Sequence, residues 1–124
     1  MNLHELDDFT LAYLECALWS STDNSRDDGG DPLDDNYGAE DMAPECLAQA
    51  VEDCRAFQAD YGSHFEGLDA QAGHDFWLTR NRHGAGFWDR PDLYGQESAR
   101  LLTEASHAYG SVDLYVGDDG AIYC

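Results

Sequence analysis

The chain has 124 residues, enough for one domain with its own hydrophobic core. It contains 26 Asp and Glu residues against six arginines, and its formal net charge of −20 argues against direct binding to nucleic acid or to an anionic membrane surface. The hydrophobic content of 43% and the aromatic content of 12% argue against a disordered acidic tail. We therefore expect a single folded domain over residues 1–124.

The first predicted element is a buried helix over Asp8–Ser20. Phe9, Tyr13 and Cys16 recur at helical spacing, which predicts one apolar stripe. Further leucines and Trp19 widen this apolar face. The helix is therefore expected to contact other elements on two sides.

An acidic segment follows the first helix. Residues 23–41 hold eight acids and one arginine, for a net charge of −7. Gly-Gly, Asp-Pro and Asn-Tyr-Gly sequences within it are turn signals. We predict a mobile acidic loop at about residues 21–42.

Three further helices are expected after this loop. The first starts at Pro44, which suits the first position of a helix, and ends before Gly62. A short helix is predicted from Ala70 to about Leu78, with Asp69 as its cap. The last is predicted over roughly Gly95–Tyr109.

The C-terminal residues carry the best strand pattern. Val112, Leu114 and Val116 alternate with polar residues, and a Gly-Asp-Asp-Gly turn precedes residues 121–124. Residues 84–88 are a candidate third strand. The predicted fold is α+β: a mainly helical domain with a small antiparallel C-terminal β-hairpin or three-stranded sheet.

The cysteine spacing and the length of the apolar runs indicate the cellular compartment in which the protein is expected. Cys16, Cys46, Cys54 and Cys124 have no CxxC spacing. The acidic start has no basic or apolar signal region, and no apolar run approaches the length of about 20 residues that a membrane span needs. We expect a protein of a reducing cytosol whose thiols pack mostly as small apolar residues.

Three long stretches resemble a known family. They are residues 10–43, the stretch AGHDFWLTRNRHGAGFWDR and the ending AYGSVDLYVGDDGAIYC. Together they are similar to a family of small acidic proteins encoded by bacteriophages and prophages, in which a glycine stands at the position of Arg82. The resemblance implies a phage protein in the cytoplasm of a bacterial host, and it carries over no catalytic residue.

Metal and catalytic sites are not expected. In the acidic loop, counted from Asp23, the sixth residue is Asp28 and the twelfth is Asp34, where an EF-hand needs glycine and glutamate. The His and Cys residues lack paired zinc spacing. Hydrolase, P-loop and zinc-deaminase motifs are missing from the sequence. No cofactor is predicted, and an enzymatic role is the less favoured one.

Residues 73–90 differ from the rest of the chain because they carry a net charge of +1. Two interpretations stay open. Arg80, Arg82 and Arg90 bridge acidic elements while neighbouring aromatics fill the core, or the segment forms a pocket for an anionic planar ligand. The internal brace is favoured over the pocket, whose candidate residues are His74, Arg80, His83 and Trp88.

The charge favours a binding protein. Twenty charges match about 34 Å of duplex DNA, close to the diameter of roughly 35 Å for a compact chain of this size. We therefore expect a phage inhibitor that imitates DNA and binds a basic nucleic-acid-binding surface of a host defence complex, of the anti-CRISPR or anti-restriction type. The alternatives are the ligand-binding or enzymatic domain above, a self-assembling phage protein, and plain solubility or salt adaptation. The predicted partner-binding residues are Asp23, Asp27, Asp28, Asp31, Asp34, Asp35, Glu40 and Asp41.

Overall fold

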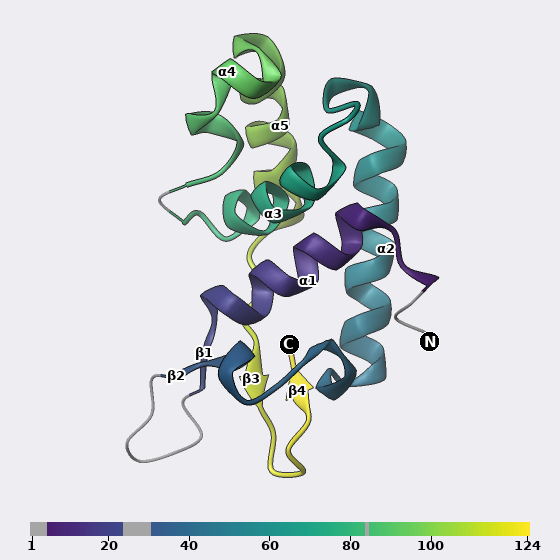
Figure 1. The fold of residues 1–124 in the computed structure, drawn as a ribbon, viewed down its shortest axis with the longest axis vertical. Coiled ribbons are helices and arrows are strands. Elements are labelled where there is room, and N and C mark those ends of the chain that lie inside the picture. Colours follow the sequence, from purple (N-terminus) through teal and green to yellow (C-terminus); the bar gives the residue numbers. More distant parts are fainter. Residues whose placement is uncertain (1–4, 24–30, 84) are drawn as a thin grey trace.

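The computed structural model describes residues 5–23, 31–83 and 85–124, and it confirms a mainly helical α+β fold with a small antiparallel C-terminal sheet (Figure 1). The helices are α1 (Asp8–Ser20), α2 (Pro44–Tyr61), α3 (Asp69–Arg80), α4 (Pro91–Tyr94) and α5 (Gln96–Tyr109). The strands are β1 (Thr22–Asp23), β2 (Asp31–Pro32), β3 (Tyr115–Val116) and β4 (Ile122–Tyr123). Short 3₁₀ turns are η2 (Leu33–Asp35), η3 (Ala39–Asp41), η4 (Gly62–His64) and η5 (Phe87–Asp89).

Helix α1 begins at a side-chain cap. The Asp7 carboxylate accepts a hydrogen bond from the Thr10 backbone N–H at 2.8 Å. Burial alone would raise the pKa of Asp7, but hydrogen bonds from Thr10 and Gln58 and the charge of Arg55 outweigh it and lower that pKa. The cap therefore stays ionised at neutral pH and favours the helix start.

Helices α1 and α3 cross in backbone contact. A Cβ atom added to Gly73 on α3 would collide with the backbone carbonyl of Phe9 on α1. Only glycine allows the two helices to approach this closely. This crossing fixes how the two helices lie against each other.

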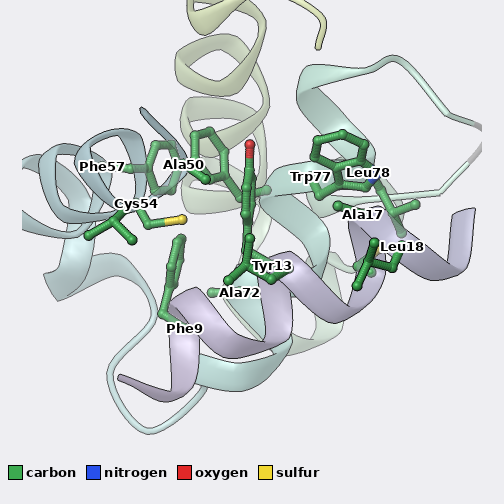
Figure 2. Close-up of a cluster of buried hydrophobic side chains, with 14 of the residues drawn as sticks. Phe9, Tyr13, Ala17, Leu18, Ala50, Cys54, Phe57, Ala72, Trp77 and Leu78 are labelled. Carbon is green, nitrogen blue, oxygen red and sulfur yellow. The ribbon is translucent and has the colours of Figure 1, made fainter. Parts of the chain in front are cut away.

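Aromatic side chains fill the core (Figure 2). Phe57 of α2 and Phe76 of α3 stack with ring centroids 4.2 Å apart, and Phe9 of α1 lies 6.0 Å and 5.9 Å from these two rings. Phe65 and Phe87 complete the set, and all five phenylalanines are buried. The expected contact of α1 on two sides is confirmed, since α1 packs on both α2 and α3.

The C-terminal hairpin pairs Tyr115 with Tyr123 and Val116 with Ile122. The predicted third strand is wrong over the described part of residues 84–88: this stretch runs into the 3₁₀ turn η5. The Phe87 N–H donates to the Thr79 hydroxyl, so it is used in packing on α3 and not in a sheet ladder. The hairpin instead contacts the chain before α2, where the Ala43 N–H donates to the Ile122 carbonyl at 2.7 Å.

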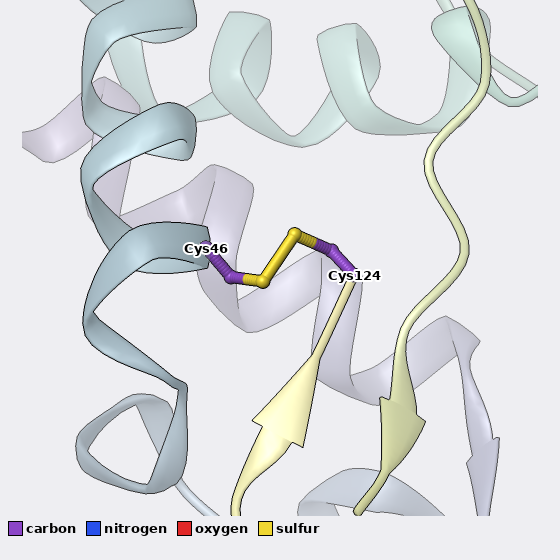
Figure 3. The surroundings of a disulfide bond; sticks show 2 residues. All are labelled: Cys46 and Cys124. Atoms are coloured by element: carbon purple, nitrogen blue, oxygen red, sulfur yellow. A yellow bond between two sulfur atoms is a disulfide. The ribbon is translucent and has the colours of Figure 1, made fainter.

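A disulfide joins Cys46 at the start of α2 to Cys124 after β4 (Figure 3). The expectation of packed thiols is therefore wrong for these two cysteines, which lie 78 positions apart and carry no recognisable spacing. It is confirmed for Cys16 and Cys54, which are buried and free. Burial and the charge of Asp75 raise the pKa of Cys16 to about 12, so this thiol stays protonated.

The acidic segment has more regular structure than the predicted loop. Its start pairs with its middle as β1 and β2, with Thr22 opposite Pro32 and Asp23 opposite Asp31. The turns η2 and η3 follow, and Leu33 of η2 is completely buried, which anchors the segment against the core. No helix of the described residues has the length and apolar character of a membrane span.

Candidate functional site

The acidic end is formed by residues 31–45 and 113–124, which contain nine carboxylates and no arginine, lysine or histidine. The two stretches lie side by side at one end of the molecule, where η2, η3 and the start of α2 meet the β3–β4 hairpin (Figure 1). Between them runs an open groove of about 420 Å³, whose acidic lining residues are Glu40, Asp41, Glu45 and Asp119.

Most of these carboxylates face solvent. Seven are exposed, and none of the eight whose side chains are described takes part in a salt bridge with another described residue. The exposed ones are Asp34, Asp35, Glu40, Glu45, Asp113, Asp118 and Asp119. The acidic end is therefore an uncompensated negative surface.

Two carboxylates are engaged locally. The Asp41 side chain accepts from the Gly38 N–H at 2.9 Å and holds the η3 turn. Asp119 accepts from the Tyr123 hydroxyl at 2.6 Å and from the Ala121 N–H at 3.0 Å, and the hydrogen bond from Tyr123 is the largest cause that lowers the pKa of Asp119. These bonds fix the orientation of both groups on the groove.

The predicted partner-binding residues divide into three groups. Asp34, Asp35 and Glu40 are exposed on the acidic end, and Asp41 is partly buried beside them. Asp23 and Asp31 are partners in the β1–β2 ladder, and their side chains are not described. Asp27 and Asp28 lie outside the described residues. The sequence prediction did not include Glu45, Asp113, Asp118 and Asp119, because they join the surface only through the contact between the hairpin and α2.

Arg80 confirms the brace interpretation. Its side chain is 4% exposed, and its guanidinium donates to the Asp53 carboxylate at 2.9 Å, to the Tyr13 hydroxyl at 3.0 Å and to the backbone carbonyls of Tyr109 and Gly110. It also lies 5.4 Å from the Phe76 ring centroid. One arginine therefore ties α1, α2 and α3 to the end of α5.

Arg90 forms a second brace. It donates to the fully buried carboxylate of Asp75 at 2.9 Å, and the Tyr94 hydroxyl donates to the same carboxylate at 2.7 Å. Burial would lower the pKa of Arg90, but the hydrogen bond and charge of Asp75 outweigh it and raise that pKa. Arg82 is exposed and has no salt bridge within the described residues, so it is not part of the brace.

The four residues of the alternative pocket do not share a cavity. His74 lines a cleft against α1, His83 lines a second depression near β3, and Trp88 lines a third beside α5. Arg80 is inside the core. Trp88 is also 52% exposed, so the expectation that the aromatics of this segment fill the core is wrong for this residue.

A cleft of about 830 Å³ lies between α1, α3 and the η2–η3 segment. Leucines of α1 and Tyr37 give it an apolar lining, and His74, Arg90, Glu15 and Asp34 add polar groups. Trp19 projects at its edge, 58% exposed, with its ring centroid 6.2 Å from that of His74.

Sequence reasoning placed Trp19 on the buried face of α1, and this is wrong. A usable signal was present, because Trp19 follows Glu15 by four positions. Residues four apart lie on the same side of a helix, so Trp19 lies beside the exposed Glu15, at the solvent edge of the apolar face of α1.

Among the described residues, no group of three or more His, Cys, Asp or Glu side chains is arranged to hold a metal ion. Comparison with protein-family models, with curated proteins and with solved structures gives no match to this chain. The acidic end and the cleft are therefore interpreted from their own geometry.

Proposed function

We propose that this protein is a phage-encoded inhibitor that binds a basic nucleic-acid-binding surface of a bacterial defence complex, of the anti-CRISPR or anti-restriction type. The observation that supports this is the acidic end: nine carboxylates on residues 31–45 and 113–124, seven of them exposed, with no cation among these residues. Such a surface attracts a partner rich in Arg and Lys.

The proposed mechanism is competition. Carboxylates of the acidic end contact the Lys and Arg side chains that otherwise contact DNA phosphates, so the inhibitor and the nucleic acid exclude each other. The buried Arg80 and the partly buried Arg90 are paired with Asp53 and Asp75, so their charges are balanced locally and do not weaken the surface field. Affinity should fall steeply with salt, as it does for DNA itself.

A charge-matched pair of variants tests the proposal. The test variant neutralises four exposed carboxylates of the acidic end, with the substitutions Asp34→Asn, Asp35→Asn, Glu40→Gln and Glu45→Gln. The control neutralises four exposed carboxylates elsewhere, with Asp60→Asn, Glu66→Gln, Asp92→Asn and Glu104→Gln. Both variants lose the same charge, so only the position of the lost charge differs.

The assay is DNA binding by a panel of purified CRISPR effectors and restriction enzymes, with increasing inhibitor, at about 50 and 200 mM salt. We expect the native chain and the control to displace DNA from one member of the panel, and the test variant to fail. Equal loss in both variants would mean that net charge, and not the acidic end, drives the interaction. Displacement by both variants would remove the acidic end from the mechanism.

The proposed location is the cytoplasm of the bacterial host. In that reducing compartment Cys46 and Cys124 would be thiols, so the proposal requires the chain to stay folded and active without its disulfide. Inhibition by the double variant Cys46→Ser, Cys124→Ser checks this requirement. A variant that is folded but inactive would contradict a cytoplasmic site of action.

A further inference from the structure

The cleft between α1 and α3 carries a large aromatic side chain, Trp19, that is mostly exposed to solvent and does not belong to the hydrophobic core. Trp19 is 58% exposed, and it lies on the wall that carries Leu11, Leu14 and Leu18. Tryptophan is among the residues most enriched at the centres of protein interfaces, since its ring supplies much contact area with few rotatable bonds. The wall and the ring together form a surface suited to an apolar side chain.

The charge of the cleft selects a cationic partner. Glu15 of α1 and Asp34 of η2 are both exposed at the cleft and have no salt-bridge partner among the described residues. Arg90 also reaches the cleft, but its charge is balanced by the buried Asp75 carboxylate at 2.9 Å. The uncompensated charge is therefore negative, which disfavours a nucleotide or another anion.

His74 of α3 supplies a second ring to the cleft. Its Nδ1 is buried, has no hydrogen-bond partner among the described groups and lies 3.7 Å from the Asp75 carboxylate. The His74 ring centroid lies 6.2 Å from that of Trp19, so the two rings together offer flat surface to an apolar or aromatic side chain.

The cleft is continuous with the acidic end. Asp34 belongs to both, and Tyr37, Gly38 and Ala39 of the η2–η3 segment line the cleft wall. The buried Leu33 anchors this shared segment to the core. A partner bound to the η2–η3 side of the acidic end would therefore be in reach of the cleft as well.

We propose that this cleft binds an apolar or aromatic side chain of the same basic partner, carried on a segment whose flanking Arg or Lys residues contact Glu15 and Asp34. This inference rests on the proposed function and names the anchor of that interface. The acidic carboxylates attract the partner, and the cleft selects a segment that places an apolar side chain between its cations.

Short capped peptides serve as probes. The first has four arginines around one phenylalanine, the second replaces the phenylalanine with serine, and the third has four glutamates around phenylalanine. Binding is measured by titration calorimetry at low salt, and the Trp19 indole N–H is followed by NMR. We expect the phenylalanine–arginine peptide to bind at least about tenfold more tightly than the serine peptide, as burial of one aromatic side chain allows.

Two tryptophan variants provide the matched comparison. Trp19→Ala should abolish the preference for phenylalanine, whereas Trp88→Ala, at a similarly exposed tryptophan (52%) outside this cleft, should preserve it. Equal binding of the first two peptides, an unchanged preference in Trp19→Ala or tighter binding of the glutamate peptide would each overturn the inference.

The peptide result is separate from the test of function. A preference that depends on Trp19, together with failure to displace DNA from any defence complex, would leave the cleft assignment standing and reject the proposed target. Displacement of DNA from a defence complex, without any preference among the peptides, would support the proposed target and reject the cleft assignment.

Discussion

Replacement of Arg80 by methionine tests whether the fold depends on its internal brace. Methionine keeps most of the side-chain volume and removes the charge and all four hydrogen bonds to Asp53, Tyr13, Tyr109 and Gly110. Loss of one partner from a buried ion pair costs about 3–5 kcal/mol, because the other charge is left uncompensated. Asp53 retains 16% exposure, which allows some hydration, so we expect about 3 kcal/mol.

The measurement is urea unfolding followed by circular dichroism. Arg82→Met is the control: it removes an exposed arginine two positions away and should change the free energy of unfolding by less than about 0.5 kcal/mol. Adding Asp53→Asn to Arg80→Met should recover about 1–2 kcal/mol, since it removes the stranded charge. A loss below about 1 kcal/mol for Arg80→Met, or no recovery in the double variant, would refute the brace.

Three further predictions concern the helix crossing, the disulfide and the α1 cap. Gly73→Ala should destabilise the fold by about 3 kcal/mol in urea unfolding, since its Cβ meets backbone, whereas Gly62→Ala, where a Cβ meets nothing, should be neutral. Reduction of Cys46–Cys124 should lower the free energy of unfolding by about 4.5 kcal/mol, from release of a 78-residue loop; equal stability with and without reductant would contradict this. Asp7→Ala should cost about 1 kcal/mol at neutral pH. Because the folded pKa of Asp7 is lowered below 3.8, this contribution is complete above about pH 4 and is lost as pH falls through the folded value, so urea titrations of the two proteins should converge in acid.

The helices were predictable because their signals are local. The predicted bounds Asp8–Ser20 agree with α1, and Pro44 does start α2. Asp69 was expected to cap α3 and instead lies inside its first turn, without a side-chain cap at the preceding residue. Helix boundaries of this kind depend on one or two residues and are the least certain part of such predictions.

The missed elements depend on contacts between distant parts of the chain. The strand pair β1–β2 and the disulfide bring together residues whose pairing has no periodic signature. The four-residue helix α4 is too short to show a period. Residues 84–88 read as a strand by composition, but Gly86 has a φ of 149° and packs on Thr79, which favours a turn.

The sequence predicted one part of the candidate site, the acids of the loop, and missed the other part. The run of acids in the sequence indicated the acidic surface directly, including Asp34, Asp35 and Glu40. The hairpin carboxylates and the cleft could not be anticipated, because each combines side chains from elements whose packing is set by tertiary structure. The same holds for Arg80: its sequence position indicated a brace, but only the fold identifies Asp53 as its partner.

The close crossing of α1 and α3 at Gly73 has a consequence for recognition. Trp19 and His74 project from two helices that are locked backbone to backbone, so the spacing of the cleft walls is set before any partner arrives. A preformed receptor of this kind loses little conformational entropy on association. The rate at which a basic partner associates should then depend on the electrostatic attraction between the two proteins. No slow opening of the cleft should precede binding.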